Sequence, residues 1–348
     1  MSRTLVKKRS LSLPVRNLGG EAGRYGTLAV LLGVFFLFAV TAPSFFSFGN
    51  LSNVLSQSSV LAIVAVGLCF VVASGGIDLS VAVSFDIGAM TAVLLLKSGA
   101  GWLPSMLIGL AAGALVGLLN SFLVVKAKIA PFLATLGTLF IGESMEKIVT
   151  KGGEPVYFPG MSEAFKWLGR GSLFVWESGD GTRIDFKFSI VIAAAVAAAA
   201  YFLLSRTVLG RYLHAIGAQK EAAALSGVPV KRYTAYAFVL CGLICSLAGM
   251  IGSSVLTSYV PMSGRYYLMD AIGAVFIGSM LHRKGYVNVP GTLVGVLFFG
   301  ILANGLNLSG IHFYWQSVVR GGVIFAILAL NSAIANRRLH AAKSNPVA

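Results

Sequence analysis

Charged residues are scarce in this sequence. Asp, Glu, Lys and Arg make up 11% of its 348 residues, hydrophobic residues make up 57%, and the mean hydropathy is +0.84. Soluble domains usually carry about 25% charged residues, so this composition excludes an ordinary cytosolic protein. A helix that crosses a bilayer needs roughly 20 apolar residues, and the chain has room for many such helices. The composition therefore predicts an all-α, polytopic membrane protein.

Cysteine and histidine are also rare. The three cysteines, Cys69, Cys241 and Cys245, lie inside apolar stretches, and the four histidines are scattered without ligand spacing. This pattern supports neither a disulfide framework nor a metal site. The chain lacks the GxxxxGK(S/T) phosphate-binding loop, so we expect no ATP site in it. Its net charge of +15 lies in loops rather than on a basic soluble domain, so we expect no nucleic-acid partner.

Ten apolar stretches are candidates for membrane spans and fill one transmembrane domain, residues 25–336. The basic segment 1–24 precedes the first span. Pro43 follows the only small-residue cleavage site directly, which favours an uncleaved span over a signal peptide. The tail is 337–348. The predicted spans are Tyr25–Thr41, Val54–Ala73, Leu79–Leu96, Leu103–Val125, Ala130–Val149, Ser189–Ser205, Tyr233–Leu256, Leu268–Leu281, Val287–Leu308 and Phe313–Ile334.

The distribution of positive charge predicts the orientation of these spans. If both termini face the cytoplasm, the inside segments collect eighteen of the 27 lysines and arginines, and the outside segments collect seven. An excess of positive charge is typical of cytoplasmic loops. We therefore expect both termini and a loop at about 206–232 to be cytoplasmic, and a larger loop at about 150–188 to be periplasmic.

Two sequence patterns concern how the spans pack. A glycine stripe, residues 109, 113 and 117, lets helix backbones approach closely, either within the chain or at a dimer seam. A faint echo also relates Lys128 and Pro131 to Lys284 and Pro290, because each pair introduces a span that runs from inside to outside. The echo is consistent with an internal repeat, and membrane-end composition explains it as well.

The stretch Ser74–Val81 interrupts an otherwise apolar region. Gly75 and Gly76 break the helix, and Asp78 or Ser80 can accept hydrogen bonds from the free N–H groups that open the next span. One interpretation is a helix N-cap in a tight turn. The other is a gate or a contact with a transported solute.

A second distinctive stretch lies in the loop between the sixth and seventh spans. Residues 221–225 favour a helix by propensity, and Gly227 with Pro229 should end it. The result would be a short cytoplasmic helix that exposes Ala222, Ala223 and Leu225. These side chains are small enough to enter a groove on another protein.

At these two places the sequence resembles the permease subunits of ATP-binding-cassette importers for ribose and related monosaccharides. The first place matches that family's S-G-G-I-D-L-S-V stretch. The second is similar to its coupling helix, which docks on the ATPase. Phe132–Gly137 and Asn304–Leu308 match as well, so the resemblance covers most of the chain from about Val54 onward.

The resemblance implies a permease subunit that forms an alternating-access pathway for a monosaccharide or related small polar solute across a bacterial inner membrane. It implies three kinds of protein partner: a second permease, two cytoplasmic ATPase domains that bind ATP and Mg²⁺, and a periplasmic substrate-binding protein. The chain is then not an enzyme and holds no cofactor. Ala82 and Asp86 depart from the family's pattern, as does the segment 278–286, which leaves the substrate open. Coupling to the ATPase falls to Gly217, Glu221, Ala222, Ala223, Leu225 and Gly227.

Polar residues within the spans are candidates for the pathway, together with Gly75, Gly76, Asp78 and Ser80 of the break. A charge inside the membrane costs about 2.5–3.5 kcal/mol, so Asp86 should line the route or pair with a basic residue such as Arg320. Neutral groups suit sugar hydroxyls, which both donate and accept hydrogen bonds. Interhelical hydrogen bonding explains the same residues equally well. The neutral candidates are Gln57, Asn120, Asn304, Asn307 and Gln316.

Two other classes of function deserve comparison. An ion-gradient-driven secondary transporter would use Asp86 and Asp270 to titrate or to bind cations. A membrane-embedded enzyme would need a cluster of His, Cys and Asp or a pair of nucleophile and base, and no spacing in the sequence suggests one. The secondary transporter is therefore the main alternative to the importer subunit.

Overall fold

The computed structural model describes residues 18–42, 44–177, 183–312, 314–327 and 329. Helices dominate them, and the strands of this part form short antiparallel pairs, β1 with β4 and β2 with β3. This confirms the all-α class. The helices are α1 (Leu18–Thr41), α2 (Phe48–Ala73), α3 (Val81–Lys97), α4 (Trp102–Val125), α5 (Pro131–Val149), α6 (Glu163–Arg170), α7 (Phe188–Arg206), α8 (Val208–Ala218), α9 (Lys220–Leu225), α10 (Val230–Leu256), α11 (Arg265–Leu281), α12 (Val289–Leu308) and the helical residues 314–327. The strands are β1 (Val156–Tyr157), β2 (Ser172–Glu177), β3 (Arg183–Lys187) and β4 (Ser258–Tyr259).

Every predicted span overlaps a helix, although not every such helix has the length and composition of a membrane span. Within the described residues, five helices are long and apolar enough to cross a membrane: α2, α4, α7, α10 and α12. Helices α3 and α11 have 17 residues each, and α5 carries two glutamates and a lysine in its second half. Of the predicted tenth span, residues 314–327 and 329 are described. The segment 1–17 and the tail 337–348 lie outside the described residues.

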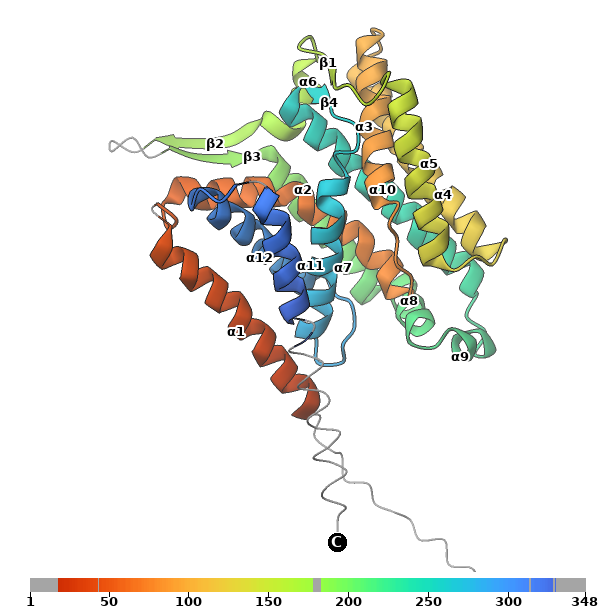
Figure 1. Ribbon diagram of the computed structural model, residues 1–348. Coiled ribbons are helices and arrows are strands. Elements are labelled where there is room, and N and C mark those ends of the chain that lie inside the picture. Colours follow the sequence, from red (N-terminus) through yellow and green to blue (C-terminus); the bar gives the residue numbers. More distant parts are fainter. Residues whose placement is uncertain (1–17, 43, 178–182, 313, 328, 330–348) are drawn as a thin grey trace, which may run out of the picture.

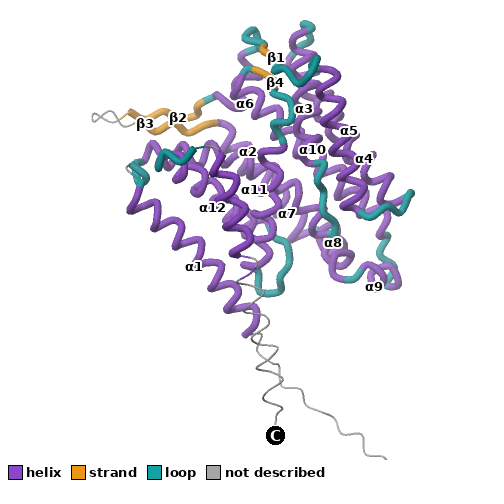
Figure 2. Tube along the Cα trace, viewed as in Figure 1, coloured by secondary structure: helices purple, strands orange, loops and turns teal. Residues whose placement is uncertain are grey.

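Helix α2 lies at the centre of the bundle. It packs against α7, α10, α11 and α12, and 83% of its most apolar window is buried inside the protein. Figure 2 shows the other helices gathered around it, with α1 at the edge. Because α2 is apolar on all faces from Val60 to Ala73, burial on every side satisfies the sequence pattern of that part.

The glycine stripe of α4 is an internal seam. A methyl group added at Gly113 would lie 2.6 Å from the Gly242 carbonyl oxygen, and one at Gly117 would lie 2.3 Å from that of Phe238. Both of these partners belong to α10, so the missing side chains let two helix backbones touch. The stripe therefore does not supply a dimer seam, because its face is already filled by this chain.

The short elements mark the two ends of the bundle. Helix α6, strands β1 and β4 and the β2–β3 hairpin gather at one end, which we name the outer end (Figure 1). Helices α8 and α9 lie toward the opposite end, together with the beginning of α1 (Figure 1). We name this the inner end. The predicted loops at about 150–188 and 206–232 thus lie at opposite ends.

Candidate functional site

Helix α9 at the inner end is the segment predicted as a coupling helix. Gly227, at φ +82°, donates its N–H to the Ala224 carbonyl, and the Val228 N–H reaches the Ala223 carbonyl, both at 3.0 Å. This pair of bonds is a Schellman cap, which needs the left-handed backbone that glycine adopts at little cost. The predicted stop at Gly227 is confirmed. Leu225, on the last turn, is 91% exposed.

The expectation that Ala223 is exposed was wrong. Its side chain is only 6% exposed, whereas Glu221, Ala222 and Leu225 are all exposed. At 100° per residue, Ala223 points opposite to the mean direction of these three side chains. It therefore faces the neighbouring helices α8 and α10. The surface that α9 offers consists of Lys220, Glu221, Ala222, Ala224 and Leu225.

Helix α8 joins this surface to the helix break that follows α2. A methyl group added at Gly217, near the end of α8, would lie 2.3 Å from the Ala73 carbonyl oxygen and 3.0 Å from the Gly75 nitrogen. In return, a methyl group at Gly75 would lie 3.1 Å from the Gly217 Cα. The two segments touch backbone to backbone, with no side chain between them. The structure thus brings together the two stretches that the sequence singled out.

The break itself is organised by a directed chain of hydrogen bonds. Thr138 of α5 donates to the Asn120 side-chain oxygen at 2.7 Å, Asn120 of α4 donates to Ser80 Oγ at 2.7 Å, and Ser80 Oγ donates to Asp78 Oδ1 at 2.6 Å. Asp78 also accepts the Ser80 N–H at 2.8 Å. The chain ties α4 and α5 to the start of α3. All four side chains are buried, so the network stabilises the break only while every member is paired.

This network supports the interpretation of the break as a capping turn. Asp78 accepts a backbone N–H just before α3, as expected of a residue in a capping turn. Ser80 occupies the N-cap position but makes no side-chain cap bond, because its hydroxyl group serves the network instead. Asn120, one of the neutral candidates, is committed to interhelical hydrogen bonds here.

A second contact anchors α8 at the inner end. The ring nitrogens of His214 lie 2.8 Å from the Gly210 carbonyl oxygen and 2.9 Å from that of Val287. Val287 belongs to the link between α11 and α12. In the same link, burial and the neighbouring His214 and Lys284 lower the pKa of His282. His214 thus connects α8 to the link that leads into α12.

At the outer end, carboxylates from α3 and α5 hold the link between α10 and α11. Asp86 is 1% exposed and accepts from Ser263 Oγ at 2.8 Å and from the Gly264 N–H at 2.9 Å. Glu146 accepts the Met262 N–H at 2.8 Å. The suggested pairing of Asp86 with Arg320 was wrong, because Arg320 Nη1 donates to Asp270 Oδ2 at 2.8 Å instead. Asp86 lies beside the outer link, where backbone and hydroxyl donors compensate for its burial.

The remaining neutral candidates divide into two groups. Asn304 exchanges two hydrogen bonds of 2.9 Å with Asn50 of α2, and Gln316 donates to Asn307 at 2.6 Å. These three candidates join helices to each other or to a neighbouring segment. Gln57 differs from them, because it lines a cavity at the outer end.

Sequence analysis missed three partners that complete these contacts. Asn50 lies in the predicted loop before the second span, and Thr138 directly follows the matched stretch that ends at Gly137. Only Thr138 is a polar residue within a predicted apolar span, which is a usable signal. Ser263 has no such signal, because serine in a loop is unremarkable until the fold places it against Asp86. In the described part of the chain, no group of three His, Cys, Asp or Glu side chains is placed to hold a metal ion.

Comparison with known proteins identifies the family. Residues 50–328 match the family described as "Branched-chain amino acid transport system / permease component". The chain belongs to this permease family. The permease is 34% identical to the ribose import permease protein RbsC of Escherichia coli K12 over 308 residues, which cover 88% of this chain and 92% of RbsC. No solved structure matches it.

Two further relatives cover almost the whole permease. The galactose/methyl galactoside import permease protein MglC of Haemophilus influenzae is 30% identical over 344 residues, covering 94% of this chain and 97% of MglC. The probable ABC transporter permease protein y4mJ of Sinorhizobium fredii is 31% identical over 344 residues, covering 97% and 99%. These matches confirm the predicted permease subunit of an ATP-binding-cassette importer. They favour it over an ion-driven transporter and over an enzyme.

Proposed function

We propose that the permease forms the alternating-access pathway for a monosaccharide or a related polar solute in a bacterial inner membrane. The names of its relatives, which include ribose and galactose import permeases, support this solute class. We further propose ten spans with both termini in the cytoplasm. The excess of lysine and arginine in the inner segments supports that orientation.

We propose as partners a second permease, two cytoplasmic ATPase domains that carry ATP and Mg²⁺, and a periplasmic substrate-binding protein. The observation that carries the coupling proposal is the exposed surface of α9. A leucine that is 91% exposed on a six-residue helix stabilises little within this chain. It suits a groove on another protein, where burying a leucine side chain contributes about 1.5–3 kcal/mol.

The contacts suggest a route for the motion. When ATP binding closes the ATPase domains, α9 moves with them and carries α8. Gly217 touches the end of α2 and the break without an intervening side chain, so displacement of α8 passes directly to both. The network from Asp78 to Thr138 then carries α3, α4 and α5 along. In this mechanism the network positions the helices and makes no contact with the solute.

Reconstitution tests the proposal. Vesicles that contain the permease, its ATPase partner and its binding protein should take up ribose or galactose only when ATP is supplied on the ATPase side. Leu225→Asp should still insert and fold but should lose at least tenfold of uptake and of binding-protein-stimulated ATP hydrolysis. Leu225→Met keeps an apolar side chain of similar volume and should retain both. Full coupling in Leu225→Asp would contradict the role of α9.

A further inference from the structure

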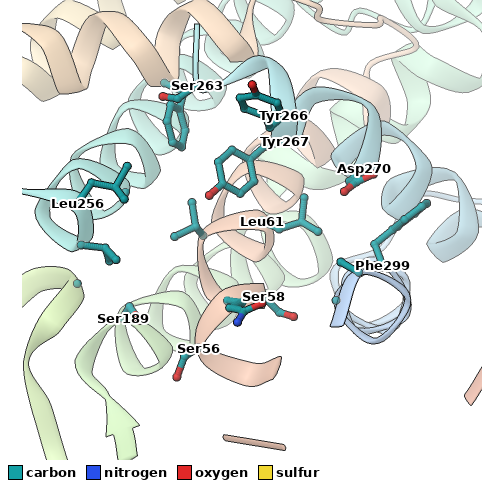
Figure 3. Close-up of a pocket in the computed structure, with 18 of the residues that line it drawn as sticks. Ser56, Ser58, Leu61, Ser189, Leu256, Ser263, Tyr266, Tyr267, Asp270 and Phe299 are labelled. Atoms are coloured by element: carbon teal, nitrogen blue, oxygen red, sulfur yellow. The ribbon is translucent and has the colours of Figure 1, made fainter. Parts of the chain in front are cut away.

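A cavity of about 490 Å³ lies at the outer end of the bundle, within this single subunit. Its walls come mainly from α2, the end of α10, the beginning of α11 and α12, with single residues of α3, α6, β3, α7 and the helical residues 314–327. Figure 3 shows Ser58, Leu61, Tyr267, Asp270 and Phe299 around the space. Sites for small molecules usually have about 300–1,000 Å³, so the cavity has the size of a ligand site.

Two buried polar atoms in the lining lack a hydrogen-bond partner within the described residues. They are Ser58 Oγ on α2 and Nε of Arg320, whose Nη1 is bonded to Asp270. The Ser58 residue is only 5% exposed, so bulk water does not compensate for the missing bond. Leaving a buried donor or acceptor unsatisfied costs about 1–3 kcal/mol. Neither atom is open to a water-sized molecule in this conformation, so a ligand would bond to it only after the Ser58 or Arg320 side chain turns toward the cavity. Such bonds would remove this cost.

The charges around the cavity favour a neutral ligand. Asp270 and Arg320 neutralise each other at 2.8 Å, and Lys187 is likewise paired with Asp185. An ionic ligand would have to break one of these pairs and leave a part-buried charge without its partner, which is unfavourable. Neutral hydroxyl groups can instead bond to the unused atoms, because each donates and accepts.

The rest of the lining is apolar and aromatic. The rings of Tyr267 and Phe85 lie 5.2 Å apart between centroids, and Phe299 closes another wall. Such walls suit the C–H faces of a sugar ring, while Ser58, Gln57 and Arg320 face its hydroxyl groups. We propose that this cavity is a monosaccharide-binding site at the outer end of the subunit, which receives the solute before it crosses. This inference rests on the proposed function, whose solute it shares.

The decisive experiment compares two serines that are adjacent on α2. Ser58→Ala removes the unpaired hydroxyl group in the cavity. Ser59→Ala removes a buried hydroxyl that bonds only to the Ser56 carbonyl within the same helix, at 2.7 Å, and does not line the cavity. In vesicles with the ATPase and the binding protein, Ser58→Ala should change ribose or galactose uptake at least threefold. Ser59→Ala should match the wild type.

A second variant fills the space. Ala303→Phe adds a ring to the cavity wall and should reduce uptake at least tenfold while the permease still assembles with its ATPase, as measured by co-purification. Binding of radiolabelled sugar to the solubilised complex, without the binding protein, should be detectable in the wild type and lost in Ala303→Phe. Wild-type uptake in both cavity variants would overturn the site. That result is expected if the space only holds a lipid chain. A wild-type complex that imports neither sugar with ATP would instead overturn the proposed function.

Discussion

The inner and outer ends of the permease are held together in opposite ways. At the inner end, α8 and the end of α2 meet through Gly217 and Gly75, whose backbones leave no room for a methyl group. At the outer end, charged side chains such as Asp270 and Arg320 join helices beside a cavity. A contact without side chains cannot rearrange by changing rotamers, so it suits the transmission of force. A side-chain pair beside open space suits a region that must admit a solute. The two ends should therefore respond to opposite substitutions, the inner one to added atoms and the outer one to lost partners.

The largest effect on stability should come from a lost partner at the outer end. Asp270→Ala leaves the part-buried Arg320 guanidinium without its carboxylate, which should cost about 3–5 kcal/mol of unfolding free energy. Thermal unfolding of the solubilised protein measures the loss. Asp270→Leu combined with Arg320→Met removes both charges and should recover most of it. Equal unfolding temperatures for the wild type and Asp270→Ala would show that the pair does not hold this end.

An added atom at the inner end should have the next largest effect. Gly217→Ala places a methyl group 2.3 Å from the Ala73 carbonyl oxygen, and such overpacking typically costs about 1–3 kcal/mol. We expect α8 to move away from the break, so that uptake falls at least tenfold while ATP binding by the partner persists. Gly33→Ala makes the same substitution on α1, where no atom lies within 4 Å. Normal transport by Gly217→Ala would show that the close contact between α8 and the break does not transmit the driving motion.

Loss of a partner can also be tested in the polar network that joins the break to α4 and α5. Thr138→Val is nearly isosteric but leaves the buried Asn120 oxygen without its donor, at a cost of about 2 kcal/mol. Ser144→Ala on the same helix removes a hydroxyl that bonds only to the Phe140 carbonyl. Unfolding temperature should fall for Thr138→Val and change little for Ser144→Ala. A larger fall in unfolding temperature for Ser144→Ala than for Thr138→Val would show that the hydrogen bond from Thr138 to Asn120 contributes little to stability.

The smallest effect should come from the cap of α9. Gly227→Ala meets open space, but its φ of +82° is a backbone conformation that costs an alanine about 1 kcal/mol. We expect a local loosening of α9, seen as faster amide hydrogen exchange at Val228, with the global unfolding temperature unchanged. A global shift would mean that α9 contributes to the stability of the whole bundle.

The sequence was sufficient to place the helices, because they leave local signals. Apolar runs located the long helices, and glycine followed by proline located the end of α9. The direction of Ala223 could have been predicted from its 100° spacing, but only with knowledge of which side of α9 faces the protein. That knowledge is a property of the packed chain.

Pairings between distant residues were beyond the sequence for a different reason. Asp86 and Arg320 are both costly in an apolar environment, so pairing them was the simplest hypothesis. The fold instead offers Asp86 two donor groups on the outer link, the Ser263 hydroxyl and the Gly264 N–H, and leaves Arg320 with Asp270. Composition identifies which charges need partners, and only the three-dimensional arrangement decides among the partners available.

The central position of α2 has one more consequence. Its last residue touches Gly217, and Gln57 and Ser58, in its first half, line the cavity. A helix of 26 residues is about 39 Å long, and this one contains no proline to bend it. In the proposed mechanism, a displacement of its inner end by α8 would therefore also displace Gln57 and Ser58. The contact with α8 and the cavity lie on one continuous helix.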